Sequence, residues 1–400
     1  MADSAQLSDE LVFLPLGGCE EIGMNLNAYG YGPPHARRWI LVDVGVTFGG
    51  LDTPGIDLIC ADPEYLVGEQ IDAIFLTHAH EDHIGAVGLL YPRLKTKAPI
   101  YATPFTTELV RSKMVERGVD PRWLKPVALG GKVEVGPFTV TYVTLTHSIP
   151  EPNALAIETP AGIILHTGDW KIDPDPQIGG PTDIKGLTAL GDRGVLAMVC
   201  DSTNVFEDGE SGSEESVKQG LIDLISKQKQ AVAVTTFASN VARVKSIIDA
   251  AEMAGRSVCL VGRSMHRITD AAKAVGILSR NLEFVDESDA KKMPSENVLY
   301  LCTGSQGEAR AALARIARND HRNVSLGEGD CVIFSSRIIP GNEREIFAMQ
   351  NSLADQGVRV ITPRMIKEPI HVSGHPCRGE LQKMYQWVRP KIAVPVHGER

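Results

Sequence analysis

The stretch FLTHAHEDHIGAV, residues 75–87, carries three histidines and an aspartate within six positions. His78, His80, Asp82 and His83 directly follow the apolar run IDAIFL, in a chain with 11 histidines among 400 residues. An apolar strand followed by this pattern presents alternate side chains on one side, and a tight turn then brings the last two around. Imidazoles and a carboxylate suit Zn²⁺, with Mn²⁺ or Fe as alternatives. A solvated polar loop is the weaker interpretation, because four potential ligands rarely fall this close by chance.

Other predicted strand ends supply further ligand candidates. His147 lies in TLTHS, His166 and Asp169 lie in LHTGDW, and His397 lies in PVHGE. Taken alone, a histidine at a strand end is more often structural than a ligand. Together with the HxHxDH turn, these residues form a constellation that predicts a metal site.

The composition is that of an ordinary globular protein, with 43% apolar and 22% charged residues. No apolar run approaches the roughly 18 residues of a membrane span, and the polar start MADSAQLSDE is not a secretory signal. The seven cysteines are scattered and never in CxxC spacing, which favours a reducing cytoplasm. A net charge of -10 argues against nucleic-acid binding without excluding it, since a basic cleft or bound cations could supply local positive charge.

The order of elements predicts one domain inserted into another. Up to about residue 200, short strands alternate with Gly/Pro turns, until the acidic loop CDSTNVFEDGESGSEES changes the pattern. Regular helix–strand alternation then predicts a doubly wound parallel α/β unit. The tail returns to strands that end in histidines. We therefore expect a first domain over 1–205, resumed over 358–400, and an inserted domain over 206–357.

LVDVG, THAHEDH, THS and HTGDW together resemble the motifs of the metallo-β-lactamase superfamily. The resemblance implies a four-layer αββα sandwich that holds two Zn²⁺ per subunit, with Mn²⁺ or Mg²⁺ as possible ions for activity. It implies that one metal takes His78, His80 and His147, the other takes Asp82, His83 and His397, and Asp169 bridges them. Asp43 is expected to orient a ligand, and His166 to be structural or to support the ligands.

CDSTN, HVSGH and VPVHGE resemble the three motifs of the beta-CASP branch, which cleaves nucleic acids. His397 at the third motif is typical of members that process RNA. PLGGCEEIGMNLNAY and LCTGSQGE add a likeness to the bacterial ribonuclease J family, from about residue 11 to the end. The family normally continues beyond PVHGE to a C-terminal domain used in assembly. Since this chain stops at Arg400, we expect it to cover the catalytic region without that whole domain.

The resemblance implies a cytoplasmic ribonuclease that acts as a 5′-to-3′ exonuclease and as an endonuclease in RNA maturation (including rRNA processing) and mRNA decay. A hydroxide bridging the two metals would attack phosphorus. The expected partners are single-stranded RNA, preferably 5′-monophosphorylated, further copies of the full-length chain in a dimer or tetramer, and RNA-decay proteins. No membrane is expected.

Catalytic roles are expected for Asp82, Asp201 and His375, with the last supplying a proton to the leaving oxygen. A second group is expected to bind substrate phosphates from strand ends and a glycine-containing loop. Its members are Ser239, Asn240, Arg263, Ser264, His371, Val372, Ser373, Gly374 and His375. Ser239 and Asn240 could equally cap the helix that follows them, and a cap site can itself bind phosphate.

Two other classes of function remain open from the sequence. A small-molecule hydrolase of the same fold, such as a thioesterase or lactamase, explains HxHxDH but leaves the inserted domain and HVSGH without a role. A non-catalytic RNA-binding or scaffold protein is disfavoured because every ligand position is filled. A diiron oxygen or nitric oxide reductase would carry HxExD and a flavodoxin domain, and the sequence has neither.

Overall fold

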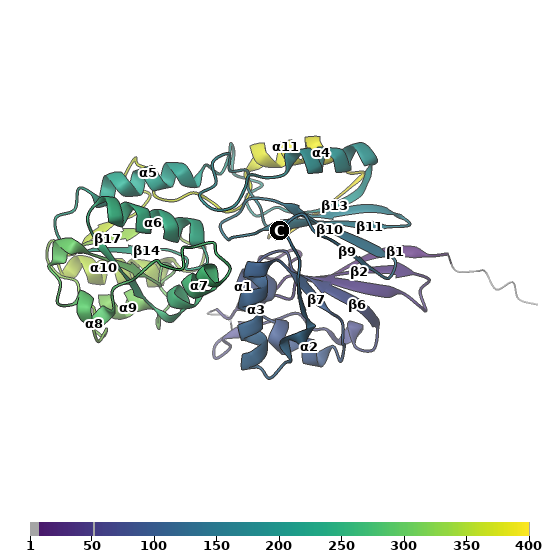
Figure 1. Ribbon diagram of the computed structural model, residues 1–400, viewed down its shortest axis with the longest axis horizontal. Coiled ribbons are helices and arrows are strands. Elements are labelled where there is room, and N and C mark those ends of the chain that lie inside the picture. Colours follow the sequence, from purple (N-terminus) through teal and green to yellow (C-terminus); the bar gives the residue numbers. More distant parts are fainter. Residues whose placement is uncertain (1–7, 51–52, 400) are drawn as a thin grey trace, which may run out of the picture. The chain divides into compact units, whose positions relative to one another are not determined.

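The computed structural model describes residues 8–50 and 53–399, so the polar segment 1–7 and the final Arg400 lie outside it. The described residues separate into two compact units (Figure 1). The first unit comprises residues up to Ile172, Gly180–Ser211 and the residues from Gly374 onward. The second unit comprises Asp173–Gly179 and Gly212–Ser373. The second unit therefore extends beyond the expected segment 206–357, because β18 (Arg359–Ile361) pairs with β17 (Cys331–Phe334) in its sheet.

Two six-stranded sheets form the centre of the first unit within its described residues. In spatial order, the strands of one sheet are β1 (Glu10–Gly17), β2 (Leu26–Gly32), β3 (Arg38–Val42), β6 (Gln70–Phe75), β7 (Ile100–Ala102) and β8 (Leu124–Pro126). Those of the other are β19 (Ile392–Val396), β13 (Val195–Asp201), β12 (Gly162–His166), β11 (Asn153–Thr159), β10 (Phe138–Thr144) and β9 (Lys132–Val135). A small hairpin joins β4 (Thr47–Phe48) and β5 (Leu58–Ile59).

Helices cover the outer faces of both sheets (Figure 1). They are α1 (Glu81–Ile84), α2 (Val87–Arg93) and α3 (Pro104–Glu116) beside the first sheet, and α4 (Ile184–Arg193) and α11 (Arg378–Val388) beside the second. One apolar cluster fills the space between the sheets, with Tyr29 and Phe75 from one and Leu155 from the other. Another cluster joins the outer face of the second sheet to α4 and α11 through Leu187 and Met384. The expected αββα sandwich is confirmed.

Local sequence explains where these elements begin and end. Asp183 caps the start of helix α4, because its side chain accepts a hydrogen bond from the backbone N–H of Gly186, and Gly194, with φ at 89°, follows the end of the helix. Helix α3 begins with Pro104, whose missing N–H costs nothing in the first turn. Strand β6 becomes fully buried over its last three residues, AIF, because both faces of the sheet are covered.

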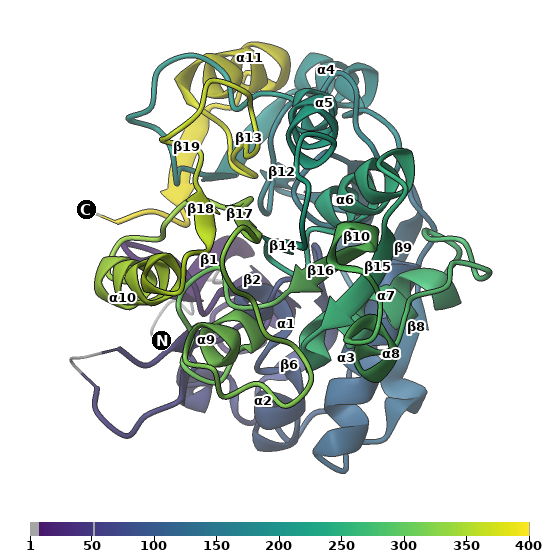
Figure 2. The same cartoon turned by 90° about the vertical axis from the view of Figure 1, so that its left-hand side faces the viewer.

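The second unit is a parallel sheet with helices on both faces, as expected for a doubly wound fold. In Figure 2 the strands of this sheet follow one another between helices on either side, in the order β15 (Ser257–Val261), β16 (Val298–Cys302), β14 (Val232–Thr235), β17 and β18. One face packs against α5 (Glu214–Ile225), α6 (Val241–Met253) and α7 (Arg263–Ala274). The other packs against α8 (Glu287–Ala290), α9 (Ala312–Ala317) and α10 (Glu343–Asp355). Within residues 8–50 and 53–399, no helix has both the length and the apolar character that crossing a membrane requires.

Candidate metal centre

All seven predicted metal ligands come together in the first unit, each following a strand end or lying in α1. They form two sets whose ligand atoms lie within 4.8 Å of one another, and both sets contain Asp169. The first set adds His78, His80 and His147, and the second adds Asp82, His83 and His397. This grouping equals the division that the family resemblance implies.

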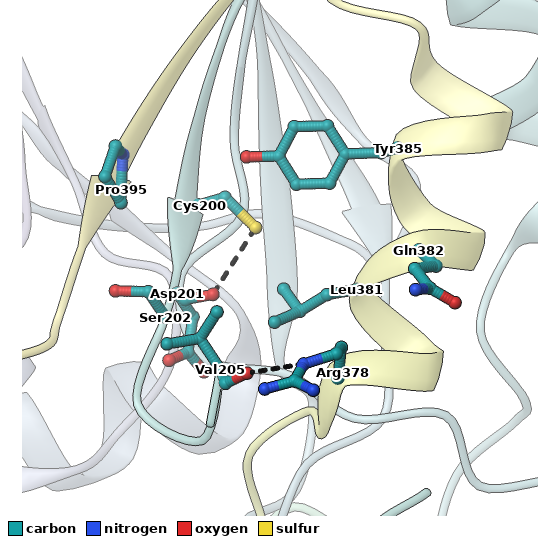
Figure 3. A pocket seen from close by; sticks show the side chains of 9 residues that line it. All are labelled: Cys200, Asp201, Ser202, Val205, Arg378, Leu381, Gln382, Tyr385 and Pro395. Atoms are coloured by element: carbon teal, nitrogen blue, oxygen red, sulfur yellow. Dashed lines mark hydrogen bonds between the residues drawn. The ribbon is translucent and has the colours of Figure 1, made fainter. Parts of the chain in front are cut away.

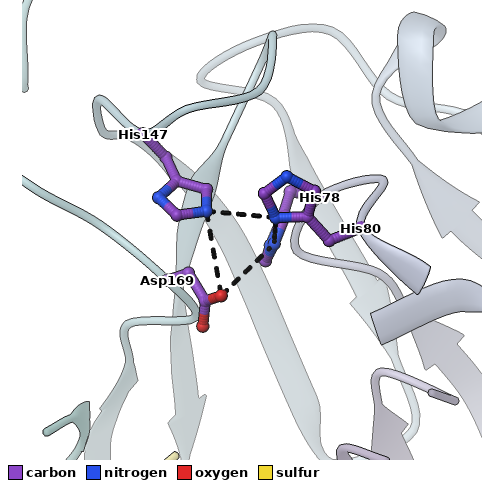
Figure 4. Close-up of side chains that lie close together, drawn as sticks. All are labelled: His78, His80, His147 and Asp169. Atoms are coloured by element: carbon purple, nitrogen blue, oxygen red, sulfur yellow. Dashed lines mark hydrogen bonds and ion pairs between the residues drawn. The ribbon is translucent and has the colours of Figure 1, made fainter. Parts of the chain in front are cut away.

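Three imidazoles of the first set face one another with Asp169 beside them (Figure 4). The Nδ1 atom of His80 lies 3.1 Å from Nε2 of both His78 and His147. One oxygen of Asp169, Oδ2, lies 3.6 Å from His78 Nε2 and 3.8 Å from His147 Nε2. Burial holds the pKa values of His78 and His147 well below normal and lowers that of His80 to about 4. Neutral imidazoles are the form that binds metal.

Hydrogen bonds on the far side of each ring decide which nitrogen is available. His147 Nδ1 lies 2.6 Å from the carbonyl oxygen of Gly374 and must donate to it, so Nε2 keeps its lone pair. His78 Nδ1 lies 2.9 Å from the hydroxyl of Thr77, which lies 2.9 Å from a carboxylate oxygen of Asp43. Because the hydroxyl donates to the carboxylate, His78 Nδ1 donates to the hydroxyl. Its Nε2 therefore also points a lone pair at the site.

The second set is strongly charged. His397 Nε2 lies 2.9 Å from Asp82 Oδ2, and His83 Nε2 lies 3.2 Å from Asp169 Oδ2. Burial alone would lower the pKa values of both histidines, but the neighbouring carboxylates outweigh it. They raise the pKa of His397 to about 9 and that of His83 well above its usual value. A cation bound here would replace these protons.

The surroundings of the two carboxylate oxygens of Asp169 show whether metal ions fit this arrangement. Its Oδ2 faces histidines of both sets, while its buried Oδ1 has no hydrogen-bond partner among the residues described. A buried carboxylate oxygen without a partner is costly, and a cation would satisfy it. The seven donors therefore fit two divalent cations that share Asp169.

The turn that carries Asp82 and His83 is fixed by residues from other strands. Both the backbone N–H of Asn25 and its side-chain amide donate to the carbonyl oxygen of Asp82, at 2.9 and 3.0 Å. Gly45 approaches so closely that a Cβ atom there would lie 1.6 Å from that same oxygen. Asp43 is fully buried and accepts from His83 Nδ1 at 2.7 Å, so it orients a ligand as expected. Because Gly45 has no side chain, the segment after β3 can lie directly against this turn.

His375 lies beside both donor sets. Its Nδ1 donates to Asp201 Oδ2 at 2.9 Å, and its ring stacks on that of His397 with centroids 5.4 Å apart. The ring of His147 lies 5.1 Å away, measured between centroids. Burial acts to lower the pKa of His375, but Asp201 outweighs it and the pKa is raised. A protonated imidazole at this position is a suitable proton donor.

Three supporting residues were not predicted from the sequence. Thr77 and Thr203 each place a hydroxyl against a histidine of the site. Asn25 holds the turn, although it lies in the quoted stretch PLGGCEEIGMNLNAY. Both threonines lie next to recognised motif residues, which was the available signal. In contrast, His166 bonds Tyr29 through Nδ1 at 2.9 Å and lies outside both donor sets.

The predicted phosphate-binding residues are divided between the units. His371, Val372 and Ser373 belong to the second, whereas Gly374 and His375 belong to the first. A Cβ atom on Gly374 would lie 2.9 Å from His147 Cε1, so only glycine allows this carbonyl to reach the histidine.

The remaining candidates lie in the second unit. Ser239 and Asn240 follow β14, and Arg263 and Ser264 follow β15, so all four lie at the carboxyl edge of its parallel sheet. Asn240 is buried and caps α6, since its Oδ1 accepts from the backbone N–H of Arg243 at 2.9 Å. Arg263 and Ser264 are exposed in the first turn of α7.

A separate cavity of about 240 Å³ lies between α11 and the strands β13 and β19 (Figure 3). Its lining residues are Cys200, Asp201, Ser202, Val205, Arg378, Leu381, Gln382, Tyr385 and Pro395. Burial raises the pKa of the Cys200 thiol to about 12, so this cysteine is not a nucleophile. Cys200 belongs to the apolar cluster that joins the second sheet to α11, whereas Asp201, which also lines the cavity, holds His375.

Comparison with known proteins identifies the class of enzyme to which the chain is similar. A model described as "Beta-lactamase superfamily domain" matches residues 38–187, "Ribonuclease J, beta-CASP domain" matches 229–353, and "Zn-dependent metallo-hydrolase RNA specificity domain" matches 358–400. A crystal structure of a protein of unknown function from Enterococcus faecalis V583 shares the fold, with a TM-score of 0.67 at 18% identity, over 97% of this chain and 94% of that one. Fold and site together define a metallo-β-lactamase-type hydrolase with a beta-CASP domain.

Similarity to relatives along nearly the whole chain identifies the family within this class of hydrolase. The chain is 49% identical over 400 residues to "Ribonuclease J" of Sinorhizobium meliloti, covering 99% of this chain and 70% of that protein. It is 43% identical to "Ribonuclease J" of Mycolicibacterium smegmatis, covering 96% and 68%. "Ribonuclease J" of Helicobacter pylori is 37% identical, covering 96% and 55%. The chain belongs to the ribonuclease J family, and the predicted resemblance is confirmed. Family and domain models together support a metal-dependent ribonuclease.

Proposed function

We propose that this protein hydrolyses RNA phosphodiester bonds with two divalent cations held by the two donor sets, zinc being the ion that these donors suit. The observation that carries the proposal is the pair of donor sets that share Asp169 beside His375. When bound, two such cations supply a water of lowered pKa as nucleophile and neutralise charge on the phosphate. Mn²⁺ or Mg²⁺ could also support activity.

The residues of the chain supply positioning and proton transfer. Asp82 and Asp169 bring two carboxylates into the centre and set its charge. His375 donates a proton to the departing 3′ oxygen, which is otherwise a poor leaving group, and this contributes roughly 10²–10⁴-fold to the rate. Asp201 keeps His375 oriented and protonated through the 2.9 Å hydrogen bond to Nδ1.

The net charge of -10 is compatible with RNA as substrate only if the site supplies local positive charge. Two divalent cations would provide this positive charge where the scissile phosphate binds. His375 adds to it, because its raised pKa favours the protonated imidazole. Arg263 adds an exposed guanidinium at the carboxyl edge of the second unit's sheet, where open α/β sheets bind ligands.

We further propose that RNA is degraded from its 5′ end as well as cleaved internally, in RNA maturation and mRNA decay. Ser239, Asn240, Arg263 and Ser264, at the carboxyl edge of the second unit's sheet, are the proposed contacts to the 5′ phosphate. The loop from His371 to His375 is separately proposed to bind substrate phosphate. A monophosphate carries about -1.5 to -2 charges, which hydroxyls, backbone N–H groups and one arginine can match. A triphosphate adds charge and bulk that this pocket would exclude. The full-length protein is proposed to act as a homo-oligomer and to bind RNA-decay proteins.

Digestion of matched RNAs that carry a 5′ monophosphate or a 5′ triphosphate tests the proposal. Exonucleolytic release of nucleotides should be faster from the monophosphate, whereas internal cleavage should not differ. Equal exonucleolytic rates would refute the pocket, and Arg263→Ala with an unchanged preference would remove that residue from it. Hydrolysis of a thioester or lactam with RNA left intact would favour the alternative, a small-molecule hydrolase.

A further inference from the structure

Two buried carboxylates outside the donor sets each hold two histidines of the site. Asp43 accepts directly from His83 Nδ1 at 2.7 Å. It also reaches His78 through a hydroxyl, because Thr77 Oγ1 lies 2.9 Å from Asp43 Oδ2 and 2.9 Å from His78 Nδ1. One carboxylate therefore fixes a histidine of each donor set, one directly and one through a threonine.

The same arrangement recurs at the end of β13. Asp201 accepts directly from His375 Nδ1 at 2.9 Å. Its other oxygen lies 2.7 Å from Thr203 Oγ1, which in turn lies 2.9 Å from His397 Nδ1. The Thr203 hydroxyl therefore links Asp201 to His397 in the same way as the Thr77 hydroxyl links Asp43 to His78.

The single hydrogen of the Thr203 hydroxyl decides which of its contacts it donates to and which it accepts from. The oxygen lies within hydrogen-bond distance of Asp201 Oδ1 at 2.7 Å, the His397 carbonyl oxygen at 2.8 Å and His397 Nδ1 at 2.9 Å. A hydroxyl has one hydrogen, and both oxygens can only accept, so the hydrogen points at one of them. His397 Nδ1 must then bring its own hydrogen. Its Nε2, 2.9 Å from Asp82, is consequently the atom left for a metal.

His397 also needs backbone support. Its φ is 53°, in the left-handed region that a residue other than glycine adopts only when its surroundings require it. The carbonyl of Gly18 accepts from its backbone N–H at 2.7 Å, and the hydroxyl of Thr203 lies against its carbonyl oxygen. A single hydroxyl thus contacts both the ring and the main chain of this ligand.

We propose that Thr203 is a positioning residue for the second cation, fixing the tautomer and orientation of His397, and that Asp201 and Thr203 connect this ligand to His375. The inference rests on the metal-binding part of the proposed function. The inference is tested by metal binding. It can therefore be wrong for a protein that hydrolyses RNA, and it can be right for a protein that does not.

Metal titration of Thr203 variants tests the role. Thr203→Val removes the hydroxyl at similar size, Thr203→Ser keeps it, and Thr203→Ala serves in place of the valine variant if that does not fold. Affinity for Zn²⁺ is measured by competition with a chromophoric chelator, and Co²⁺ absorption spectra report the geometry at each ion. Far-UV circular dichroism of the metal-free proteins checks folding.

Thr203→Val should bind one ion as the unaltered protein does and the other about 10–100-fold more weakly, the range typical for loss of a partner behind a metal ligand. Thr203→Ser should restore both ions. Ser202→Ala is the matched control, because this neighbouring hydroxyl bonds the Val396 carbonyl at 2.7 Å and should leave both affinities unchanged.

Thr77→Val should weaken the first donor set instead, with a different change in the Co²⁺ spectrum. Undiminished affinity for both ions in Thr203→Val would overturn the proposal. So would a Ser202→Ala variant that is equally weak, or a Thr203→Ser variant that does not recover.

Discussion

At the scale of single residues, the centre depends on which nitrogen of each histidine carries hydrogen. Backbone carbonyl, hydroxyl and carboxylate acceptors occupy Nδ1 of His78, His83, His147 and His397, and so direct Nε2 of each toward the donor sets. His80 differs, since its Nδ1 faces the other two imidazoles. The nitrogen of each ring that faces the donor sets is therefore fixed by the protein before any cation arrives.

His375→Ala should lower the turnover rate on RNA by roughly 10²–10⁴-fold, because the leaving 3′ oxygen loses its proton donor. Both ions should remain, since His375 belongs to neither of the two donor sets, although it forms a third group of possible ligands with Asp201 and His397. An RNA with sulfur in place of the bridging 3′ oxygen has a better leaving group and should recover most of the lost rate. If the variant instead lost an ion, His375 would be a ligand and its assignment as proton donor would be wrong.

The ligands could be predicted from the sequence because each lies in a short motif at a strand end, where local pattern and chemistry coincide. The supporting contacts could not. Thr203 and His397 are 194 positions apart, and their contact exists only because β13 and β19 pair in parallel. The same holds for Asn25, whose role depends on where the turn at Asp82 comes to lie.

At the scale of elements, a buried ion pair organises the second unit. The Arg243 side chain on α6 is fully buried and binds both carboxylate oxygens of Glu214 on α5 at 2.8 Å. Its Nη1 also donates to the carbonyl oxygens of Ser335, after β17, and Ile370, just before His371, at 3.0 and 3.3 Å. The arginine thus joins two helices, a strand end and the approach to the predicted phosphate loop.

Arg243→Met should reduce the free energy of unfolding of this unit by about 3–5 kcal/mol, because the buried Glu214 carboxylate loses the guanidinium that pairs with both of its oxygens. Changing Glu214 to Leu as well should recover part of the loss. Lys245→Ala on the same helix is the control, since it breaks a partly exposed pair with Asp249 and should cost about 0–1 kcal/mol. Urea unfolding followed by circular dichroism measures all three. Equal losses for Arg243→Met and Lys245→Ala would contradict the structural role.

Element types were predictable here where periodicity was strong, as in the helix–strand alternation of the second unit. The place of the three-residue strand β18 was not predictable: the tail from residue 358 was expected to return to the first domain, whereas pairing with β17 puts this strand in the second unit. For Asn240, sequence left capping and phosphate binding equally open. The structure shows the cap, which leaves phosphate binding as a proposal.

At the scale of the whole molecule, histidines buried as neutral groups make metal-free protein sensitive to acid. Burial lowers the pKa values of His80 and His166 to about 4, while an unfolded histidine titrates near 6.5. Between these values the unfolded chain binds more protons than the folded one, so acid favours unfolding. Burial acts to raise the pKa values of Asp82 and Asp169, but the neighbouring histidines outweigh it and lower them. The stability from these lowered values is lost mainly as the pH falls below the unfolded value of about 3.9.

The free energy of unfolding of metal-free protein should therefore fall as the pH drops from 6.5 to 4, by about 1.4 kcal/mol per pH unit for each such histidine. Urea unfolding at several pH values checks this, and His166→Gln should flatten the dependence. His397 acts in the opposite direction and in a different range, since stability from its raised pKa is lost as the pH rises through about 9. A stability that does not change between pH 6.5 and 4 would contradict the neutral state of the buried imidazoles.

Insertion of the second unit into the first was predictable because histidine-bearing strand ends occur on both sides of the helix–strand alternation. That order requires His397 to return to the turn of residues 78–83, and the structure shows that it does. The final arrangement of charge was less predictable, since the net charge of -10 says nothing about a centre where four imidazoles meet one carboxylate.

Two cations that share Asp169 are proposed to act together in RNA hydrolysis. The most direct test adds Zn²⁺ or Mn²⁺ stepwise to chelator-stripped protein and measures, on the same samples, bound metal per chain by elemental analysis and the rate of cleavage of 5′-labelled RNA. We predict two ions at saturation, negligible cleavage without metal, and a rate that follows occupancy of the second ion. Asp169→Asn should bind fewer ions and remain inactive. Full activity with one ion bound, or cleavage by metal-free protein, would contradict the claim.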